Sequence, residues 1–366
     1  MRFEVQREPL LTALQAIVGV VERRQTLPVL GNIRVEAETG QLRLTSTDLE
    51  VELVAHLDVE TTSDGAITLP ARKWLDICRN LPEGAQLQIS FEQGRANLRA
   101  GNSRFSLATL PVEEFPEIES IGATEAVELP RGELRRLIEC THFSMAQHDV
   151  RYYLNGLLLE LTGRGARTVA TDGHRLALAE GETPITVAQP RQVIVPRKGV
   201  QELMRLLDDA DEPARLELGE NHIRVTLNTV RFTSKLIDGV FPDYNRVIPQ
   251  DGDKHLLVDR QALRQALSRV VILSNEKYRG VRFAAEGETL RIGSHNPEQE
   301  EAEEELEIEY GGEAVELGFN ANYLLDALGA MDTERVQVTL TDANSSGLLR
   351  GEGVEHARYV IMPMRL

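Results

Sequence analysis

The densest group of side chains that could do chemistry lies at residues 171–177, which read TDGHRLA. Asp172 and His174 could act as an acid and base pair, but no Ser or Cys nucleophile motif, phosphate loop or metal-ligand spacing accompanies them. The alternative is a tight turn, in which Asp172 accepts backbone amides and Gly173 supplies an unusual dihedral angle. We favour the turn and keep an enzyme centred on these residues as the alternative.

Basic side chains recur near the starts of the expected helices. Scattered cations usually only solvate a helix face, but recurrence in repeated units would align them along one wall. Without a base-reading module, such a wall would contact phosphates and not read sequence. The cations are Arg72, Lys73, Arg131, Arg135, Arg136, Arg197, Lys198, Arg260 and Arg264.

An acidic run extends from Glu298 to Glu309. It lacks the spacing of a calcium loop, so a solvated face is the ordinary interpretation. Near the other end of the chain, basic residues surround the apolar Phe105; they are Lys73, Arg95, Arg99 and Arg104. These complementary ends favour head-to-tail association of two copies.

The carboxy-terminal residues YVIMPMRL form an apolar strand without a polar tail. Strand alternation puts Val360, Met362, Met364 and Leu366 on one face. A buried edge strand is the ordinary interpretation. Two methionines beside Pro363 also suit a surface that accommodates several partners.

The whole-chain composition narrows the class of protein. The chain has 366 residues, 42% of them hydrophobic, and a net charge of −18. So acidic a chain needs a local basic surface to bind nucleic acid. The amino terminus does not read as a secretion signal, and Glu160 interrupts the most apolar run. Two cysteines, Cys78 and Cys140, form no metal or disulfide framework, so we expect a protein of the cytoplasm without metal or cofactor.

An internal threefold repeat organises these features. Aligning Val5, Leu129 and Val258 also aligns later apolar positions at helical spacing. The first helical segments are FEVQREPLLTALQAI (3–17), VELPRGELRRLIECT (127–141) and LLVDRQALRQALSRV (256–270). The second helical segments are ITLPARKWLDICRNL (67–81), VIVPRKGVQELMRLL (193–207) and VELGFNANYLLDALGAM (315–331). The repeat predicts three α+β domains, 1–124, 125–250 and 251–366, each with two helices packed among antiparallel strands.

With these motifs in view, the chain resembles the bacterial DNA polymerase III β-subunit family over its full length. The most specific segments are TLPVLGN (26–32), QHDVRYYLNG (147–156), TVATDGHRLA (168–177), VIVPRKG (193–199), FTSKLIDGVFPDYNRV (232–247), ILSNEKYRGVR (272–282), NPEQEEAEEEL (296–306) and the final strand. The resemblance implies a sliding clamp and processivity factor of the replicative polymerase, not a catalytic subunit. It also implies a six-domain ring of two head-to-tail chains, which closes when each domain turns the chain by about 60°.

The resemblance also implies which residues function. A partner-peptide groove between the second and third domains would comprise Leu154, Thr171, Gly173, His174, Arg175, Leu176, Pro242, Arg246, Val247, Asn320, Tyr323, Ser346, Val360, Ile361, Met362, Pro363, Met364, Arg365 and Leu366. Double-stranded DNA would contact Arg24, Arg72, His148, Tyr152, Tyr153, Arg197 and Lys198. The dimer interface would comprise Lys73, Arg95, Arg104, Phe105, Ile272, Leu273, Glu298, Glu300, Glu301, Glu303 and Glu304.

The implied partners are duplex DNA, a second copy of the chain, the polymerase III α subunit and the clamp loader. Other polymerases, mismatch-repair proteins and ligase would bind through short peptides with a glutamine and apolar anchors. An enzyme and a static DNA-coating protein without a ring remain the alternatives. Threefold repetition without a repeated acid and base set counts against the enzyme.

Overall fold

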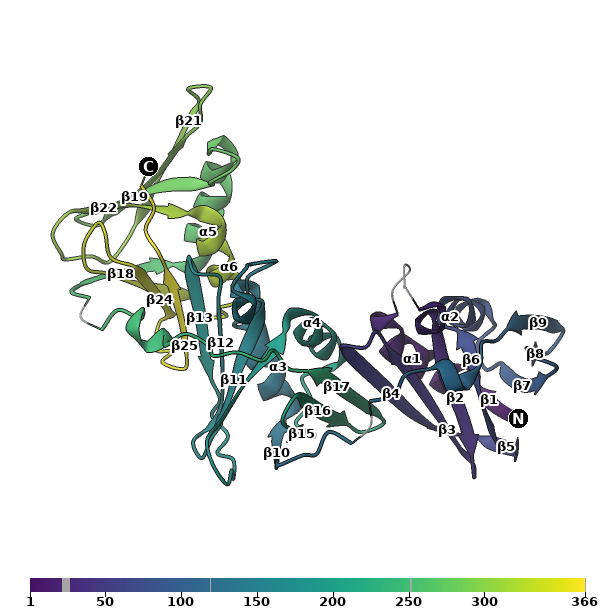
Figure 1. The fold of residues 1–366 in the computed structure, drawn as a ribbon. Coiled ribbons are helices and arrows are strands. Elements are labelled where there is room, and N and C mark those ends of the chain that lie inside the picture. The colour runs from purple at the N-terminus through teal and green to yellow at the C-terminus, as the bar shows by residue number, and fades with distance from the viewer. Residues whose placement is uncertain (22–26, 119, 251, 366) are drawn as a thin grey trace. The chain divides into compact units, whose positions relative to one another are not determined.

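The computed structural model describes residues 1–21, 27–118, 120–250 and 252–365 (Figure 1). Within them, each third of the chain repeats one order: a strand, a helix, a group of strands, a second helix and three more strands. The predicted α+β fold is confirmed, and all six predicted helical segments are helices.

The elements of the three repeats correspond one to one, except for an extra strand, β5, in the first. The first repeat contains β1 (Arg2–Gln6), α1 (Arg7–Ile17), β2 (Asn32–Glu38), β3 (Gln41–Thr47), β4 (Val51–Asp58), β5 (Glu60–Ser63), β6 (Gly65–Pro70), α2 (Ala71–Asn80), β7 (Gln86–Glu92), β8 (Arg95–Ala100) and β9 (Ser103–Ala108). The second contains β10 (Glu125–Pro130), α3 (Arg131–Glu139), β11 (Gly156–Thr162), β12 (Gly165–Thr171), β13 (Arg175–Glu180), β14 (Arg191–Pro196), α4 (Arg197–Leu206), β15 (Pro213–Leu218), β16 (His222–Leu227) and β17 (Val230–Lys235). The third contains β18 (Lys254–Asp259), α5 (Arg260–Val270), β19 (Gly280–Glu286), β20 (Thr289–His295), β21 (Glu301–Glu307), β22 (Val315–Asn320), α6 (Ala321–Gly329), β23 (Arg335–Leu340), β24 (Gly347–Gly351) and β25 (Ala357–Ile361).

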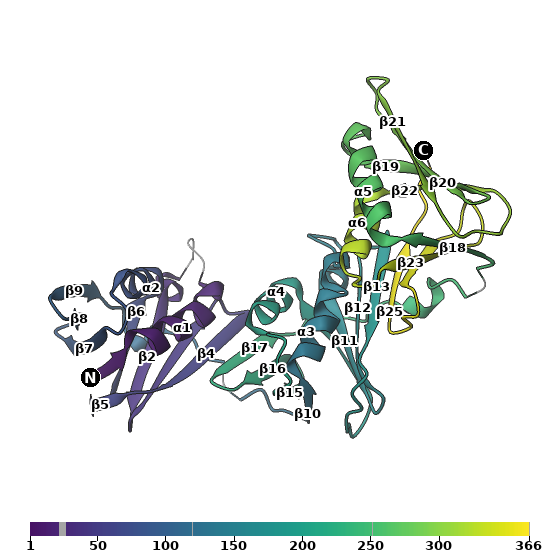
Figure 2. The same cartoon turned by 180° about the vertical axis from the view of Figure 1, so that it is seen from behind.

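Each helix begins immediately after a strand, at a residue that ends the strand pairing or caps the helix. Pro70, Pro130 and Pro196 directly precede α2, α3 and α4. Asp259 caps α5 by accepting a hydrogen bond from the Ala262 amide at 2.7 Å. Apolar residues at helical spacing then face the sheets, so α1 packs on β3 and β4, as Figure 2 shows from behind.

Two eight-stranded sheets cross the repeat boundaries. One has the order β10-β15-β16-β17-β4-β3-β2-β6, so β17 of the second repeat pairs with β4 of the first. The other has the order β14-β11-β12-β13-β25-β24-β23-β18, so β13 of the second repeat pairs with β25 of the third. Smaller sheets, β5-β1-β7-β8-β9 and β21-β20-β19-β22, complete the first and third repeats.

The described residues form two compact units that divide the middle repeat. One unit comprises Met1–Gly132 and Lys198–Leu236, and the other comprises Glu133–Arg197 and Ile237–Leu366. The division follows from the two shared sheets, because each half of the middle repeat is continued by a neighbour. Domain boundaries near residues 124 and 250 stay a prediction.

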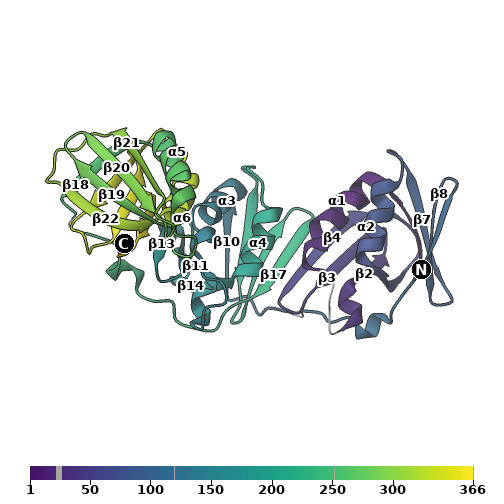
Figure 3. The same ribbon diagram turned by 90° about the horizontal axis from the view of Figure 1, so that it is seen from above.

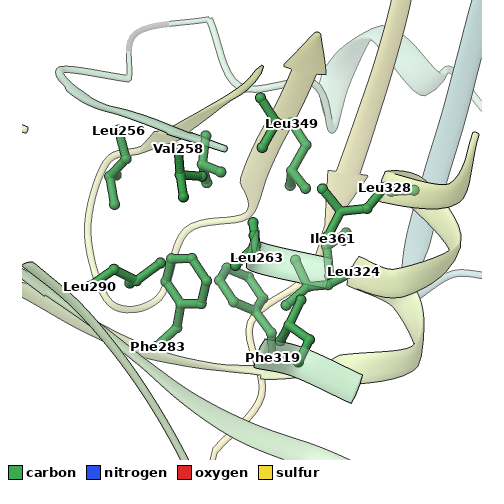
Figure 4. Close-up of a cluster of buried hydrophobic side chains, with 14 of the residues drawn as sticks. Leu256, Val258, Leu263, Phe283, Leu290, Phe319, Leu324, Leu328, Leu349 and Ile361 are labelled. Carbon is green, nitrogen blue, oxygen red and sulfur yellow. The ribbon is translucent and has the colours of Figure 1, made fainter. Parts of the chain in front are cut away.

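The second unit has a large apolar core around α5 and α6, which lie side by side against the β19–β22 sheet (Figure 3). The rings of Phe283 and Phe319 pack edge to face with their centres 5.8 Å apart. Leu263 of α5 and Leu324 of α6 belong to the same cluster (Figure 4). This burial fixes α6 beneath the carboxy-terminal strand, since Ile361 belongs to the same cluster.

The predicted basic stripes are partly wrong, because several of their cations serve the fold. Arg131 is buried and pairs with Glu212 at 2.9 Å, and Arg260 donates to the Leu328 carbonyl oxygen at 3.1 Å. Arg135 pairs with Glu139 on its own helix. Arg72 and Arg264 are exposed, although Arg72 also donates to the Val21 carbonyl oxygen at 2.8 Å, so only part of the predicted set is available to phosphates.

None of the described helices combines the length and the apolarity that crossing a bilayer requires.

Candidate functional site

The TDGHRLA segment is a capped turn between β12 and β13, as we favoured. Asp172 Oδ1 accepts the amides of His174 at 2.9 Å and Arg175 at 3.1 Å. Gly173 has φ +88°, and a Cβ added there would lie 2.9 Å from Arg151 Nη2. Asp172 Oδ2 binds the Arg175 guanidinium, so its carboxylate is occupied and His174 points to an exposed surface.

This turn borders an apolar pocket of about 250 Å³. One wall is the sheet, where Leu176 of β13 lies opposite Val360 of β25. The other wall is the segment 242–247, which carries Pro242, Tyr244 and Val247. The complete lining is Arg151, Tyr153, Leu154, Thr171, Gly173, Arg175, Leu176, Pro242, Asp243, Tyr244, Val247, Val360 and Met362. An apolar hollow with a few polar groups at its edge suits short peptide anchors.

Arg175 joins the pocket to α6. Its guanidinium donates to Asp172, to Asp326 and to the Phe143 carbonyl oxygen, and lies 4.5 Å from the centre of the Tyr323 ring. Burial raises the pKa of the Tyr323 hydroxyl. These four contacts of one side chain make Arg175 a rigid part of the wall.

Arg151 borders the pocket on the opposite side of the turn. It forms a two-pronged ion pair with Asp149, with N–O distances of 3.0 and 2.9 Å. The Arg151 guanidinium lowers the pKa of Asp149 to about 2. Sequence reasoning missed four lining residues, Arg151, Tyr153, Asp243 and Tyr244, and assigned Tyr153 to DNA instead. The aromatic residue in FPDYNRV was a signal for Tyr244.

Nine of the predicted groove residues line this pocket: Leu154, Thr171, Gly173, Arg175, Leu176, Pro242, Val247, Val360 and Met362. The others lie elsewhere. Arg246 pairs with Asp243 at 3.0 Å and is exposed, and Asn320 caps α6. Ser346 immediately precedes β24, and Leu366 lies outside the described residues.

The predicted alternation along the carboxy terminus holds for Val360 and Met362, which line the same pocket, and is wrong for Met364. β25 ends at Ile361, because Pro363 has no amide to continue the ladder. Met362 lines the pocket, whereas Met364 donates its amide to the Gly318 carbonyl oxygen at 2.9 Å and lines a separate hollow with Tyr278 and Arg365. β25 is also not an edge strand, since β13 and β24 flank it.

The equivalent position at the other shared sheet is polar. The pair Leu176 and Val360 corresponds in register to Glu52 and Thr233. The amide of Met362 donates to the His174 carbonyl oxygen at 2.9 Å. In the same way, the amide of Lys235 donates to the Glu50 carbonyl oxygen at 2.9 Å. Lys235 therefore stands where Met362 stands, and its ammonium group pairs with Glu50.

The predicted DNA-contacting residues differ in how accessible they are. His148, Tyr152 and Tyr153 share one loop, in which His148 and Tyr152 are exposed and Tyr153 is half-buried beside the pocket. The Arg197 amide donates to the Asn155 carbonyl oxygen of this loop at 3.0 Å. Arg197 is half-buried, and burial lowers the pKa of its guanidinium. Lys198 pairs with Asp48, and Arg72 is exposed on α2. Arg24 lies outside the described residues.

Comparison with known proteins identifies the fold. Family models for the N-terminal, central and C-terminal domains of the DNA polymerase III beta subunit match residues 1–119, 128–243 and 245–365. The beta sliding clamps of Pseudomonas putida and Escherichia coli are 53% and 50% identical over the whole of both chains. A crystal structure of the Pseudomonas aeruginosa DNA polymerase sliding clamp superimposes with a TM-score of 0.98, at 51% identity and full coverage of both chains.

Three clamp domains with this topology define a processivity factor, the class that holds a polymerase to its template and performs no catalysis itself. The chain belongs to the DNA polymerase III beta subunit family. The prediction of a sliding clamp of DNA replication is confirmed.

Proposed function

We propose that two copies of the chain close head to tail around duplex DNA, and that the pocket beside Thr171–Leu176 binds short peptides of replication and repair proteins. The observation that carries the ring is the repeated strand pairing. β4 of the first repeat pairs with β17 of the second, and β13 of the second repeat pairs with β25 of the third. The third repeat has β21 in the place of β4 and β13, and the first repeat has β9 in the place of β17 and β25. Within the described residues, neither β21 nor β9 has a partner on its outer edge. Pairing β9 of one copy with β21 of the next repeats the same junction and closes the assembly.

The repeat also supplies a register for this pairing. Phe232 lies opposite Leu53, and Tyr359 lies opposite Ala177. Phe105 follows an arginine in β9, as Phe232 and Tyr359 do in their strands. Ala302 corresponds to Leu53. Ser294 lies opposite Ala302, and Ser46 lies opposite Leu53. Each of these serine hydroxyls donates to the last carbonyl oxygen of the preceding helix.

Phe105 should therefore face Ala302 of the partner copy, and Arg104 should face its Glu303. The exposure patterns agree with this register, because Phe105 and Ala302 are half-buried, whereas Arg104 and Glu303 are exposed. Glu304, also predicted for the interface, binds Arg269 of its own chain at 2.9 Å. Arg95 is also engaged within its sheet, where it donates to Ser106 Oγ at 2.8 Å.

An aromatic contact supports the apolar part of the interface. At the β13–β25 junction, Phe143 stacks on Tyr359 with ring centres 6.0 Å apart. Phe143 corresponds to Ile272, 129 residues further on, by the spacing of Leu129 and Val258. Ile272 is 70% exposed, as expected for a side chain that meets Phe105 only in the ring.

Reversing the charge of Arg104 tests this register. Arg104→Glu sets two carboxylates opposite each other at both junctions, which should raise the dimer dissociation constant about 10-fold to 30-fold. Adding Glu303→Arg should restore the wild-type constant. Sedimentation at serial dilution measures both changes.

Arg99→Glu is the matched control, because Arg99 lies on the same exposed face, one strand in from the edge. Its effect should be smaller, and Glu303→Arg should not correct it. Equal correction of Arg99→Glu and Arg104→Glu would contradict the register.

The remaining partners and DNA contacts belong to the same proposal. The loop with His148, Tyr152 and Tyr153, together with Arg72, Arg197 and Lys198, would contact phosphates without reading sequence. The clamp loader, the polymerase III α subunit, other polymerases, mismatch-repair proteins and ligase would use the pocket in turn. This work takes place on chromosomal DNA, in the cytoplasm.

A further inference from the structure

The pocket wall at residues 242–247 has little regular structure of its own. It contains one short 3-10 turn, Tyr244–Arg246. The exposed Asp243 makes its hydrogen bonds within this segment, where it accepts from the Asn245 amide at 3.3 Å and binds Arg246. Something else must hold Pro242 and Val247 at a fixed distance from the sheet.

Tyr244 makes that connection. Its side chain is 6% exposed and packs in the cluster beneath the pocket with Leu176 and Val360. Its hydroxyl donates to Glu160 Oε2 at 2.7 Å and accepts from Arg167 Nη1 at 2.8 Å. Burial and the bond to Glu160 raise the pKa of Tyr244 to about 12, so the hydroxyl keeps its proton near neutral pH.

Glu160 is the buried charge that interrupts the apolar strand β11, with 4% exposure. It lies between Arg167 of β12 and Gln192 of β14, its direct neighbours across the sheet, and both donate to it. A buried carboxylate without such donors would be strongly unfavourable.

The polar row continues toward the pocket's other wall. Arg167 also binds Glu180 of β13, and Glu180 binds Arg358 of β25 at 3.1 Å. Arg358 is two residues from Val360 on the same strand. One row of charges thus connects the sheet wall, through Glu160, to the irregular wall at Tyr244.

We infer that Tyr244 and Glu160 are positioning residues that set the width of the peptide pocket. This inference rests on the proposed peptide binding. Tyr244→Phe keeps the packed ring but removes both hydrogen bonds of the hydroxyl, the one to Glu160 and the one from Arg167, so the wall loses its anchor. Affinity for a peptide should fall about 3-fold to 10-fold, within the range usual for the loss of a buried hydrogen-bonding group.

Two measurements test this inference. Fluorescence polarisation of a labelled peptide, with one glutamine and two apolar anchors, gives the affinity. Amide hydrogen exchange of the intact dimer reports how firmly the wall at residues 242–248 is held. In Tyr244→Phe, exchange should accelerate at residues 242–248 and stay unchanged in β11–β13. Glu160→Gln keeps an acceptor and should lose less affinity. Combining it with Tyr244→Phe should cost no more than Tyr244→Phe alone.

Tyr310→Phe is the matched control. Its hydroxyl donates to the Glu313 carbonyl oxygen, in a buried site that does not line the pocket. It should lower the melting temperature without changing peptide affinity. Full affinity and wild-type exchange in Tyr244→Phe would overturn the positioning role, whereas no peptide binding by the wild-type dimer would overturn the proposed function instead.

Discussion

Met362→Lys is expected to weaken peptide binding about 100-fold or more, because it removes an apolar contact and sets an unpaired ammonium group beside Leu176 and Val360. Met362 is 38% exposed, so the lysine can reach water in the free protein and the fold should survive. Fluorescence polarisation with the same labelled peptide measures the affinity. Sedimentation should give an unchanged dimer mass.

Lys235→Met is the control that the repeat provides. Lys235 occupies the equivalent position at the β4–β17 junction, so this change adds a methionine where no apolar pocket is expected. Its peptide affinity should equal that of the wild type. If Met362→Lys binds the peptide at full strength, the pocket is not the partner site.

The second large effect is expected at the ring closure. Replacing Ile272 and Leu273 with alanine removes four aliphatic side chains per ring, since both junctions change. At about 1–2 kcal/mol per side chain, the dimer dissociation constant should rise about 1,000-fold or more. Sedimentation at micromolar concentration should then detect monomers.

Val150→Ala with Val240→Ala is the control for that change. Both valines are more exposed than Ile272 but lie outside the proposed interface. They should leave the dimer mass unchanged. An intact dimer in the Ile272 and Leu273 variant would mean that β9 and β21 do not form the junction.

The sequence predicted the repeated fold well because its signals are local and occur three times. Apolar spacing marks α1, α3 and α5, and Pro70, Pro130 and Pro196 mark where strands end and helices begin. The Asp172 turn was also predictable, since an Asp side chain readily accepts nearby backbone amides and the following Gly tolerates a positive φ.

The parts that failed depend on contacts distant in sequence. The sequence pattern predicted Arg131 to be a surface cation, but it forms an ion pair with Glu212, 81 positions later. The sequence marks Tyr244 as an aromatic residue, but its anchoring role could not be predicted because its partner Glu160 lies 84 positions earlier. Alternation put Met364 beside Met362, but Pro363 ends the strand and Gly318 captures the Met364 amide. Such partners follow from the assembled sheet and not from local pattern.

Retention on DNA tests the central claim most directly. The protein is loaded onto a nicked circular plasmid by its clamp loader, purified with the DNA by gel filtration, and the plasmid is then cut once. A closed ring holds DNA by topology more than by phosphate contacts, so the protein should stay on the circle and leave the cut DNA through its free ends. Bulky proteins bound at both ends should restore retention. Equal retention on circular DNA and on linear DNA with free ends would contradict the account.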